Sequence, residues 1–214
     1  MKIRWLGHSC FMITAEKGTK VLTDPYNKLV NYELPEVEAD IVSTSHNHND
    51  HNNINAVKGS FVHINNPGSF STNGIEIKGV ATFHDSVSGA KRGNNTIFNF
   101  MFDEINVCHC GDLGHILDSN QIEEIGKVDI LLVPVGGLFT INAFDAVKVM
   151  KQLNPTIVIP MHYRTEALGL RGYAFAKAEK FISASGLKAR LYEELQIHKE
   201  NIKDYSGVAV FNYK

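Results

Sequence analysis

Four residues with strong metal-binding side chains fall within the run His46-Asn47-His48-Asn49-Asp50-His51, in the pattern H-x-H-x-D-H. In an extended segment residues i and i+2 point to the same side, so His46 and His48 can hold one cation. Asp50 and His51 follow and can face a second cation beside the first. Imidazole and carboxylate ligands together suit zinc, with manganese or iron as alternatives. A polar loop rich in His, Asn and Asp is the simpler interpretation, but this spacing favours a site for two divalent metal ions.

Further donors stand where predicted strands end. Asp112 directly follows the predicted strand 105–110, and glycines on both sides of it allow the backbone to bend sharply. An aspartate in that position could bridge two metals. His84 and His162 also follow predicted strands, and functional side chains tend to collect where a rigid scaffold delivers a loop. These three residues are the candidates that would complete the site.

The elements that position these residues change in type along the chain. The first half is rich in short β-branched or aromatic runs, with hairpin turns expected at Glu16-Lys17-Gly18 and Asp103-Glu104, and the second half alternates strands with helices. This order implies an α/β (α+β) fold with two sheets face to face and helices outside. No linker divides residues 1–214, so we expect one domain. The predicted strands are 2–6, 10–15, 20–24, 41–45, 61–65, 75–83, 96–102, 105–110, 129–135, 156–162 and 207–212, and the predicted helices are 119–126, 142–153 and 173–185, the last ended by Gly186.

The composition excludes some classes of protein. A formal net charge of −2 argues against broad electrostatic capture of nucleic acid, which needs a basic face. No apolar run reaches the roughly 18 residues of a membrane span, and the first residues lack the features of a signal peptide. Cys10, Cys108 and Cys110 are an odd number of cysteines, which suggests reduced thiols packed in a core and a cytoplasmic location.

A series of motifs gives the chain a resemblance to a known family. In chain order these motifs are Trp5-Leu6-Gly7-His8-Ser9-Cys10, Leu22-Thr23-Asp24-Pro25-Tyr26, the H-x-H-x-D-H run, Phe83-His84-Asp85, Arg92-Gly93-Asn94-Asn95-Thr96, Gly111-Asp112, Val133-Pro134-Val135-Gly136-Gly137 and Pro160-Met161-His162-Tyr163. With them the sequence resembles the metallo-β-lactamase superfamily, in the branch similar to L-ascorbate-6-phosphate lactonase and the N-acyl-phosphatidylethanolamine-hydrolysing phospholipase D. The resemblance runs from residue 1 to about residue 165 and implies an αββα sandwich, but such folds carry many chemistries.

The resemblance also sorts the ligands and implies a reaction. Two metal ions about 3.5–4 Å apart would share a water and form a bridging hydroxide, which attacks an ester, lactone, amide or phosphodiester centre. Asp50 would orient this nucleophile and carry a proton to the leaving group. The implied ligands are His46, His48 and His84 for the first metal, Asp50, His51 and His162 for the second, and Asp112 as the bridge and second catalytic carboxylate.

The remaining histidines and acids near the motifs are expected to play other parts. Asp24 is expected to accept a hydrogen bond from a ligand histidine and fix its ring. Beside His84, Asp85 is an alternative donor. His109 is interpreted as a partner of the ligands, although it could be mistaken for one in place of His84. The histidines with non-ligand interpretations are His8 and His115 near the motifs, and His63 and His198 outside them.

Groups around the mouth of the site should select the substrate. Lys91, Arg92 and Arg164 could meet a phosphate or carboxylate, and Arg92 also lies in the Arg-Gly-x-Asn-Thr segment of the family. Asn95 and Tyr163 could donate to a developing oxyanion. The expected substrate is therefore a small, anionic molecule.

Three other functions remain open at this point. An iron-dependent redox enzyme of the same fold is disfavoured because di-iron relatives usually have Glu where His48 stands. A nuclease or phosphodiesterase acting on nucleic acid is disfavoured by the absent basic face. A non-catalytic metal-binding module is disfavoured by the complete ligand set. True β-lactamase activity is not expected, since that subgroup is exported and this chain shows no signal.

Overall fold

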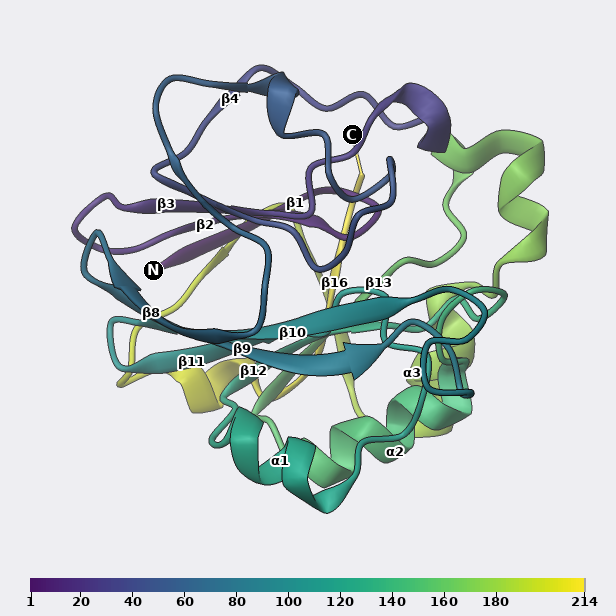
Figure 1. Cartoon of the computed structure of the whole chain (residues 1–214). Helices are drawn as coiled ribbons and strands as arrows, with labels where there is room; N and C mark the ends of the chain where they lie inside the picture. Colours follow the sequence, from purple (N-terminus) through teal and green to yellow (C-terminus); the bar gives the residue numbers. More distant parts are fainter. Residues whose placement is uncertain (214) are drawn as a thin grey trace.

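Two β-sheets pack face to face in the computed structural model of the protein, which describes residues 1–213 (Figure 1). The smaller sheet has six strands in the order β15 (Leu195–Gln196), β1 (Lys2–Gly7), β2 (Cys10–Thr14), β3 (Lys20–Thr23), β5 (Ile41–Ser43) and β7 (Val62–Ile64). The larger has eight, in the order β14 (Ala189–Tyr192), β16 (Gly207–Phe211), β13 (Ile157–Met161), β12 (Ile130–Pro134), β11 (Ile105–His109), β10 (Asn94–Phe102), β9 (Ile75–Phe83) and β8 (Gly68–Thr72).

The main core lies between the two sheets. Ile3 and Phe11 from the smaller sheet and Phe98 and Phe100 from the larger are completely buried in the same cluster. Strands β12 and β13 are buried along their whole length, which follows from their position between the smaller sheet and the outer helices. Burial of this apolar area fixes the two sheets against each other and makes the scaffold rigid.

Three α-helices cover the outer face of the larger sheet: α1 (Ser119–Ile125), α2 (Ala143–Leu153) and α3 (Ala178–Ser185) (Figure 1). Helix α1 begins at a capping box formed by Asp118 and Gln121, and α2 begins at Asn142, whose side chain accepts two backbone N–H bonds. Gly186 ends α3 in a left-handed conformation, as predicted. No helix within residues 1–213 has the length and apolar character that crossing a bilayer requires.

The predicted α/β sandwich is confirmed, but the layer outside the smaller sheet is built differently from the one that the resemblance implied. Among the described residues no α-helix covers that face. Instead it carries coil, the short strands β4 (Val37–Glu38) and β6 (Val57–Lys58), and two 3-10 turns (Lys28–Val30 and Ile54–Ala56) (Figure 1). Tyr26 and Tyr32 from this layer pack in a second cluster with Leu22 and Val42 of the sheet below.

The third helix starts later than predicted. Residues 166–174 form a 3-10 segment (Glu166–Ala174) that is kinked at Gly169, which has φ 54° and ψ −139°, and α3 begins only at Ala178. The strands that were not predicted, β8, β14, β15, β4 and β6, are five residues long or shorter. A last 3-10 turn (Ile202–Tyr205) precedes β16.

Strand direction brings the chemistry-bearing residues to one edge of the sandwich. Strands β1, β3 and β5 of the smaller sheet run parallel to one another, because β1 and β3 both pair antiparallel with β2 and β3 pairs parallel with β5. Strands β9, β11 and β13 of the larger sheet also share one direction. Loops that follow parallel strands meet at the same edge. The residues delivered there are His8, Asp24, His46, His84, Asp112 and His162.

Candidate metal centre

Three histidines form a first group of possible ligands. His46 and His48 come from the loop after β5, and His84 comes from the end of β9 on the other sheet. The ring centroid of His46 lies 4.6 Å from that of His48 and 4.8 Å from that of His84. One nitrogen from each ring lies within 4.8 Å of the others, which is close enough to share an ion. These are the three residues that the resemblance assigned to the first metal.

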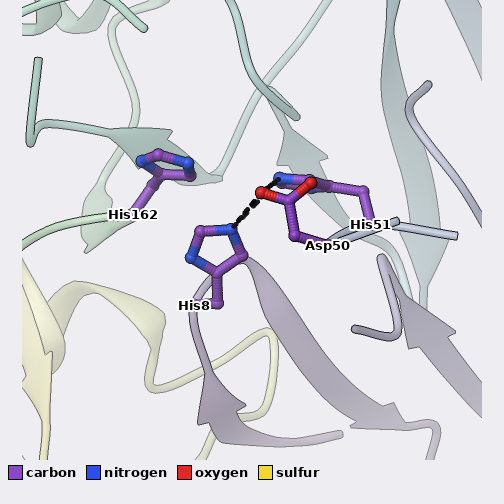
Figure 2. Close-up of side chains that lie close together, drawn as sticks. All are labelled: His8, Asp50, His51 and His162. Atoms are coloured by element: carbon purple, nitrogen blue, oxygen red, sulfur yellow. Dashed lines mark hydrogen bonds and ion pairs between the residues drawn. The ribbon is translucent and has the colours of Figure 1, made fainter. Parts of the chain in front are cut away.

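A second group lies beside the first and contains one residue more than expected. Asp50, His51 and His162 offer donor atoms within 4.8 Å of one another, and His8 belongs to the same group (Figure 2). His51 and His162 are buried, whereas the Asp50 side chain keeps 36% of its surface exposed. The sequence interpretation left His8 outside the ligand set. The structure places its ring among these donors.

Asp112 lies between the two groups. Its Oδ2 is 3.2 Å from His84 Nε2 and 3.4 Å from His162 Nε2, and its Oδ1 is 3.3 Å from His51 Nε2. One carboxylate therefore contacts a histidine of the first group and two of the second. This is the position that a bridging ligand requires.

Unpartnered buried atoms show that the donor set fits a cation. His46 Nε2 and Asp112 Oδ1 are buried and make no hydrogen bond within residues 1–213. A buried polar atom without a partner costs about 1–3 kcal/mol, so native proteins rarely leave one unsatisfied. Imidazole nitrogen and carboxylate oxygen are the donors that zinc and related divalent ions prefer. A bound ion would satisfy both atoms.

The protonation states also suit metal binding, which requires neutral imidazoles and ionised carboxylates. Burial lowers the pKa of His46 to about 3. Burial raises the pKa of Asp112, but His162 and His51 offset this and hold it well below its usual value. His51 differs: burial lowers its pKa, yet Asp112 and Asp24 raise it well above the usual value. A cation that binds His51 Nε2 would therefore displace a proton.

Asp24 and Ser45 orient two of the histidine rings. Asp24 Oδ2 lies 2.9 Å from His51 Nδ1, the position predicted for the acceptor of a ligand histidine. Asp24 also accepts from the Ser45 backbone N–H at 2.7 Å and from its hydroxyl at 2.6 Å. The same hydroxyl lies 2.9 Å from His46 Nδ1. The sequence did not reveal Ser45, although its place beside His46 was a usable signal.

Asn95 has a different position from the one expected of an oxyanion donor. It is buried, and its amide donates to Thr82 Oγ1 at 2.8 Å and to the Cys110 carbonyl at 3.0 Å. Its carbonyl oxygen accepts from the Asp112 backbone N–H at 2.9 Å. Both amide hydrogens are thus used inside the protein. The contacts make Asn95 a support for the Asp112 loop in place of a substrate contact.

Gly111 allows the close approach of this loop. Its φ is +56°, and a Cβ added there would lie 2.4 Å from both Asn95 Oδ1 and Ser45 Cβ. We expect Gly111→Ala to destabilise the fold by about 2–4 kcal/mol, because overpacking and a left-handed backbone both carry a cost. Gly186→Ala is the matched control, since Gly186 has a left-handed backbone, φ 68° and ψ 6°, with open space around it. Equal losses in urea unfolding for the two variants would contradict the steric argument.

Other acids and histidines near the motifs are fully engaged elsewhere. Asp85 accepts four backbone N–H bonds of its own loop, two on each oxygen, which leaves it poorly placed as an alternative to His84. His109 Nε2 lies 2.8 Å from the Ser9 carbonyl, and its Nδ1 accepts from the Gly111 N–H. The remaining histidines have partners outside the ligand groups: His115 with Phe83 and Ile116, His63 with Thr44, and His198 with Glu16.

A cleft opens beside the first histidine group. It has a volume of about 460 Å³ and is lined by His46, His48, Asn66, Arg92 and Asn94. The Arg92 guanidinium lies 3.9 Å from the centre of the Phe139 ring. Such stacking holds a guanidinium in place while its N–H groups remain available to an anion. Arg92 therefore lines the cleft next to the first histidine group.

Tyr163 and Arg164 do not face this cleft. The Tyr163 ring stacks on Trp5 at 5.4 Å between centroids, and the Arg164 guanidinium lies over the Tyr173 ring at 3.7 Å. Both line a separate, larger cavity of about 900 Å³ that includes none of the metal-donor residues. His162 follows β13 in a left-handed conformation, with φ 53°, and after this turn the Tyr163 ring packs on Trp5. The predicted contacts of these two residues with a substrate are therefore corrected.

Comparison with known proteins agrees with this geometry. Residues 2–162 match the beta-lactamase superfamily domain. A UPF0173 metal-dependent hydrolase from Thermoplasma acidophilum is 31% identical over 192 residues, covering 77% of this chain and 84% of the relative. Another from Pelotomaculum thermopropionicum is 32% identical over 198 residues, covering 77% and 85%.

A solved structure extends the similarity over the whole chain. A proposed zinc-dependent hydrolase of the metallo-beta-lactamase superfamily from Thermotoga maritima superimposes with a TM-score of 0.83 and 38% sequence identity. The match covers 100% of this chain and 99% of that one. The last fifty residues, where the motifs stop, thus have counterparts in a structure of the same superfamily.

Proposed function

We propose that this chain, which belongs to the beta-lactamase superfamily and to its UPF0173 metal-dependent hydrolases, holds two divalent ions and cleaves an ester, lactone or phosphodiester bond of a small anionic molecule. The observation that carries the proposal is the position of Asp112, whose two oxygens contact histidines of both groups. His46, His48 and His84 would hold one ion, and Asp50, His51 and His162 the other, with Asp112 as the bridge. Zinc is the preferred ion, with manganese or iron as alternatives.

The bound ions would lower the pKa of a shared water and polarise the oxygen of the scissile group. Proton transfer and the orientation of the ligands depend on the side chains of the protein. Asp50 is the most exposed carboxylate of the site, and His8 and His51 lower its pKa although burial raises it, so it stays ionised. It can accept the proton of the attacking water and pass it to the leaving group. Asp24 accepts from His51 Nδ1–H, so Nε2 is the nitrogen that would bind a metal, with loss of the proton that the neighbouring carboxylates favour there.

Arg92 is the residue that supports a negatively charged substrate. The cleft beside His46 and His48 has the size of a small-molecule site. Arg92 is the cationic side chain in its lining, and the neighbouring amides can accept or donate further bonds. A phosphate or carboxylate of the substrate would bind here bidentately while the reacting bond reaches the metal donors.

Arg92→Ala is expected to raise KM for an anionic substrate about 10- to 100-fold, since one charge-assisted interaction contributes about 1.5–3 kcal/mol. For a neutral ester the change should be small. Steady-state kinetics with mono-p-nitrophenyl succinate, whose free carboxylate is separate from the scissile ester, and with neutral p-nitrophenyl acetate measure the difference. Lys91→Ala is the matched control, because Lys91, although named as a candidate from the sequence, is exposed, does not line the cleft and contacts Asp85 only through its backbone N–H. Equal effects of Arg92→Ala on both substrates would contradict the assignment.

A substrate panel tests the reaction class. Zinc- and manganese-loaded protein would be assayed with p-nitrophenyl acetate, a γ-lactone and bis(p-nitrophenyl) phosphate, before and after removal of metal with a chelator. Metal-dependent cleavage of one of these supports the proposal. Two bound ions without cleavage of any would favour a metal-binding module. A visible absorption band with iron as the retained metal would favour redox chemistry.

A further inference from the structure

His8 occupies a strained position that directs its ring into the second ligand group. It follows β1 and has φ 53°, a left-handed conformation that is uncommon for residues other than glycine, although histidine adopts it more often than most; His162 of the same group has it too. Such strain persists where the surrounding structure fixes it, and it is common at functional sites. The His8 carbonyl accepts from the Trp5 indole N–H at 3.0 Å and from the His162 backbone N–H at 3.2 Å. These bonds hold the turn against the loop that carries His162.

The distances from the His8 ring match those between ligands of one ion. His8 Nε2 lies 3.2 Å from His51 Nε2 and 3.5 Å from Asp50 Oδ2 (Figure 2). Ligand atoms at about 2.0–2.2 Å from one zinc ion lie about 2.8–3.6 Å from their neighbours, depending on whether four, five or six ligands share the ion. The His8 ring centroid is also 4.3 Å from that of His162. His8 thus stands at ligand spacing from the donors of the second group.

A hydrogen bond between His8 and His51 is the competing explanation of the short contact. Such a bond can run in either direction, from His8 Nε2–H to His51 Nε2 or from His51 Nε2–H to His8 Nε2. Asp24 binds the opposite nitrogen of the His51 ring, so Nε2 is the atom that points at the metal donors. Once His51 Nε2 binds an ion it carries no proton and has no free lone pair, so it can neither donate a hydrogen bond to His8 nor accept one from it. The nitrogen of His8 then faces either the ion itself or Asp50.

We infer that His8 is a ligand of the second metal ion, through Nε2, in addition to Asp50, His51, His162 and the bridging Asp112. The inference rests on the proposed function, because it needs an ion at the second group. It leaves the first ion with its own three histidines. The second ion would then have more protein ligands than the first, and the water and the substrate would have easier access to the first ion. This agrees with the position of the cleft beside His46 and His48.

The direct test is a zinc-loaded crystal structure of the unsubstituted protein, with anomalous diffraction at the zinc edge to place the ions. A distance of about 2.0–2.3 Å between His8 Nε2 and the second ion supports the inference. A distance beyond 3 Å overturns it and leaves His8 as a hydrogen-bond partner of Asp50. Binding of fewer than two ions would contradict the proposed function itself, so the two failures are distinguishable.

Metal affinity of a His8→Asn variant gives a second readout. Asparagine tolerates the left-handed turn, but its side chain is too short to reach the ion. Calorimetric titration of metal-free protein with zinc chloride should show the first equivalent bound as in the unsubstituted protein and the second bound at least about 10-fold more weakly. His63→Asn is the matched control, since His63 is a partly buried histidine bonded to Thr44 outside both groups. Unchanged binding of both equivalents by a folded His8→Asn variant would contradict the inference.

Discussion

The Asp112→Ala variant is expected to lose hydrolytic activity by at least about 10³-fold, which corresponds to about 4 kcal/mol of transition-state stabilisation. Asp112 contacts His84, His51 and His162, so under the proposed function its removal would take one ligand from each ion at once. Bound metal should fall together with activity.

The variant should still fold. The bond that anchors the loop runs from the Asp112 backbone N–H to Asn95 Oδ1, and alanine keeps it. Circular dichroism and urea unfolding check the fold, and elemental analysis checks the metal. Asp204→Ala is the matched control, because Asp204 is an exposed aspartate outside both ligand groups. An Asp112→Ala protein with full metal content and full activity would refute the bridging role.

Asp24→Asn is expected to weaken metal binding about 10- to 100-fold and to lower stability by about 1–3 kcal/mol. The carboxylate of Asp24 accepts from Ser45 twice and from His51 once. An amide supplies only one oxygen, so an N–H group must face either His51 Nδ1 or Ser45. In the first case the His51 ring takes the other tautomer, which puts a proton on the nitrogen needed by the metal.

The backbone of Asp24 does not obscure this result, because asparagine also tolerates its φ of 40°. Asp40→Asn is the matched control: Asp40 accepts from the Lys20 backbone N–H and has no contact with a histidine ligand. It should lose some stability but no metal. Calorimetric zinc titration and urea unfolding measure both quantities. Loss of stability without loss of metal affinity in Asp24→Asn would show that Asp24 supports the loop only.

The acid side of the stability curve should also change in Asp24→Asn. Burial raises the pKa of Asp24, but its bonds to His51 and the nearby His109 and His46 lower it below the usual value. A carboxyl group whose pKa is lowered in the folded state stabilises the protein at pH values above its unfolded-state pKa of about 4. This stabilisation is lost as the pH falls through the folded-state pKa. The variant lacks this contribution, so its unfolding free energy should fall less steeply below pH 4.

Periodicity and turn chemistry were sufficient to predict most of the scaffold. Strand β9 lies at the predicted residues 75–83, because its alternation and flanking polar residues mark both ends. The start of α3 was wrong since the sequence before it lacks a strong capping residue; Lys177 occupies the N-cap without a side-chain bond. The coil layer over the smaller sheet has no periodicity, so its form depends on tertiary packing of residues such as Tyr26 and Tyr32.

The residues that the sequence analysis missed or expected elsewhere are those whose position depends on the direction of the side chain. The spacing of H-x-H-x-D-H and the strand-end positions of Asp112 and His162 mark the donors, because these depend on chain order. The His8 side chain reaches the site through a left-handed turn that no local sequence pattern predicts. The saturation of Asn95 depends on neighbours from two other strands. The direction of Tyr163 depends on the left-handed turn at His162, which the alternation of residues along the preceding strand does not predict.

The most direct test of a two-metal hydrolytic centre is a titration of metal-free protein with zinc or manganese while hydrolysis of the best substrate from the panel is followed. We expect activity to rise with added metal and to reach its plateau at two equivalents per chain, with calorimetry giving the same number of bound ions. A plateau at one equivalent, or two bound ions without any activity, would contradict the account.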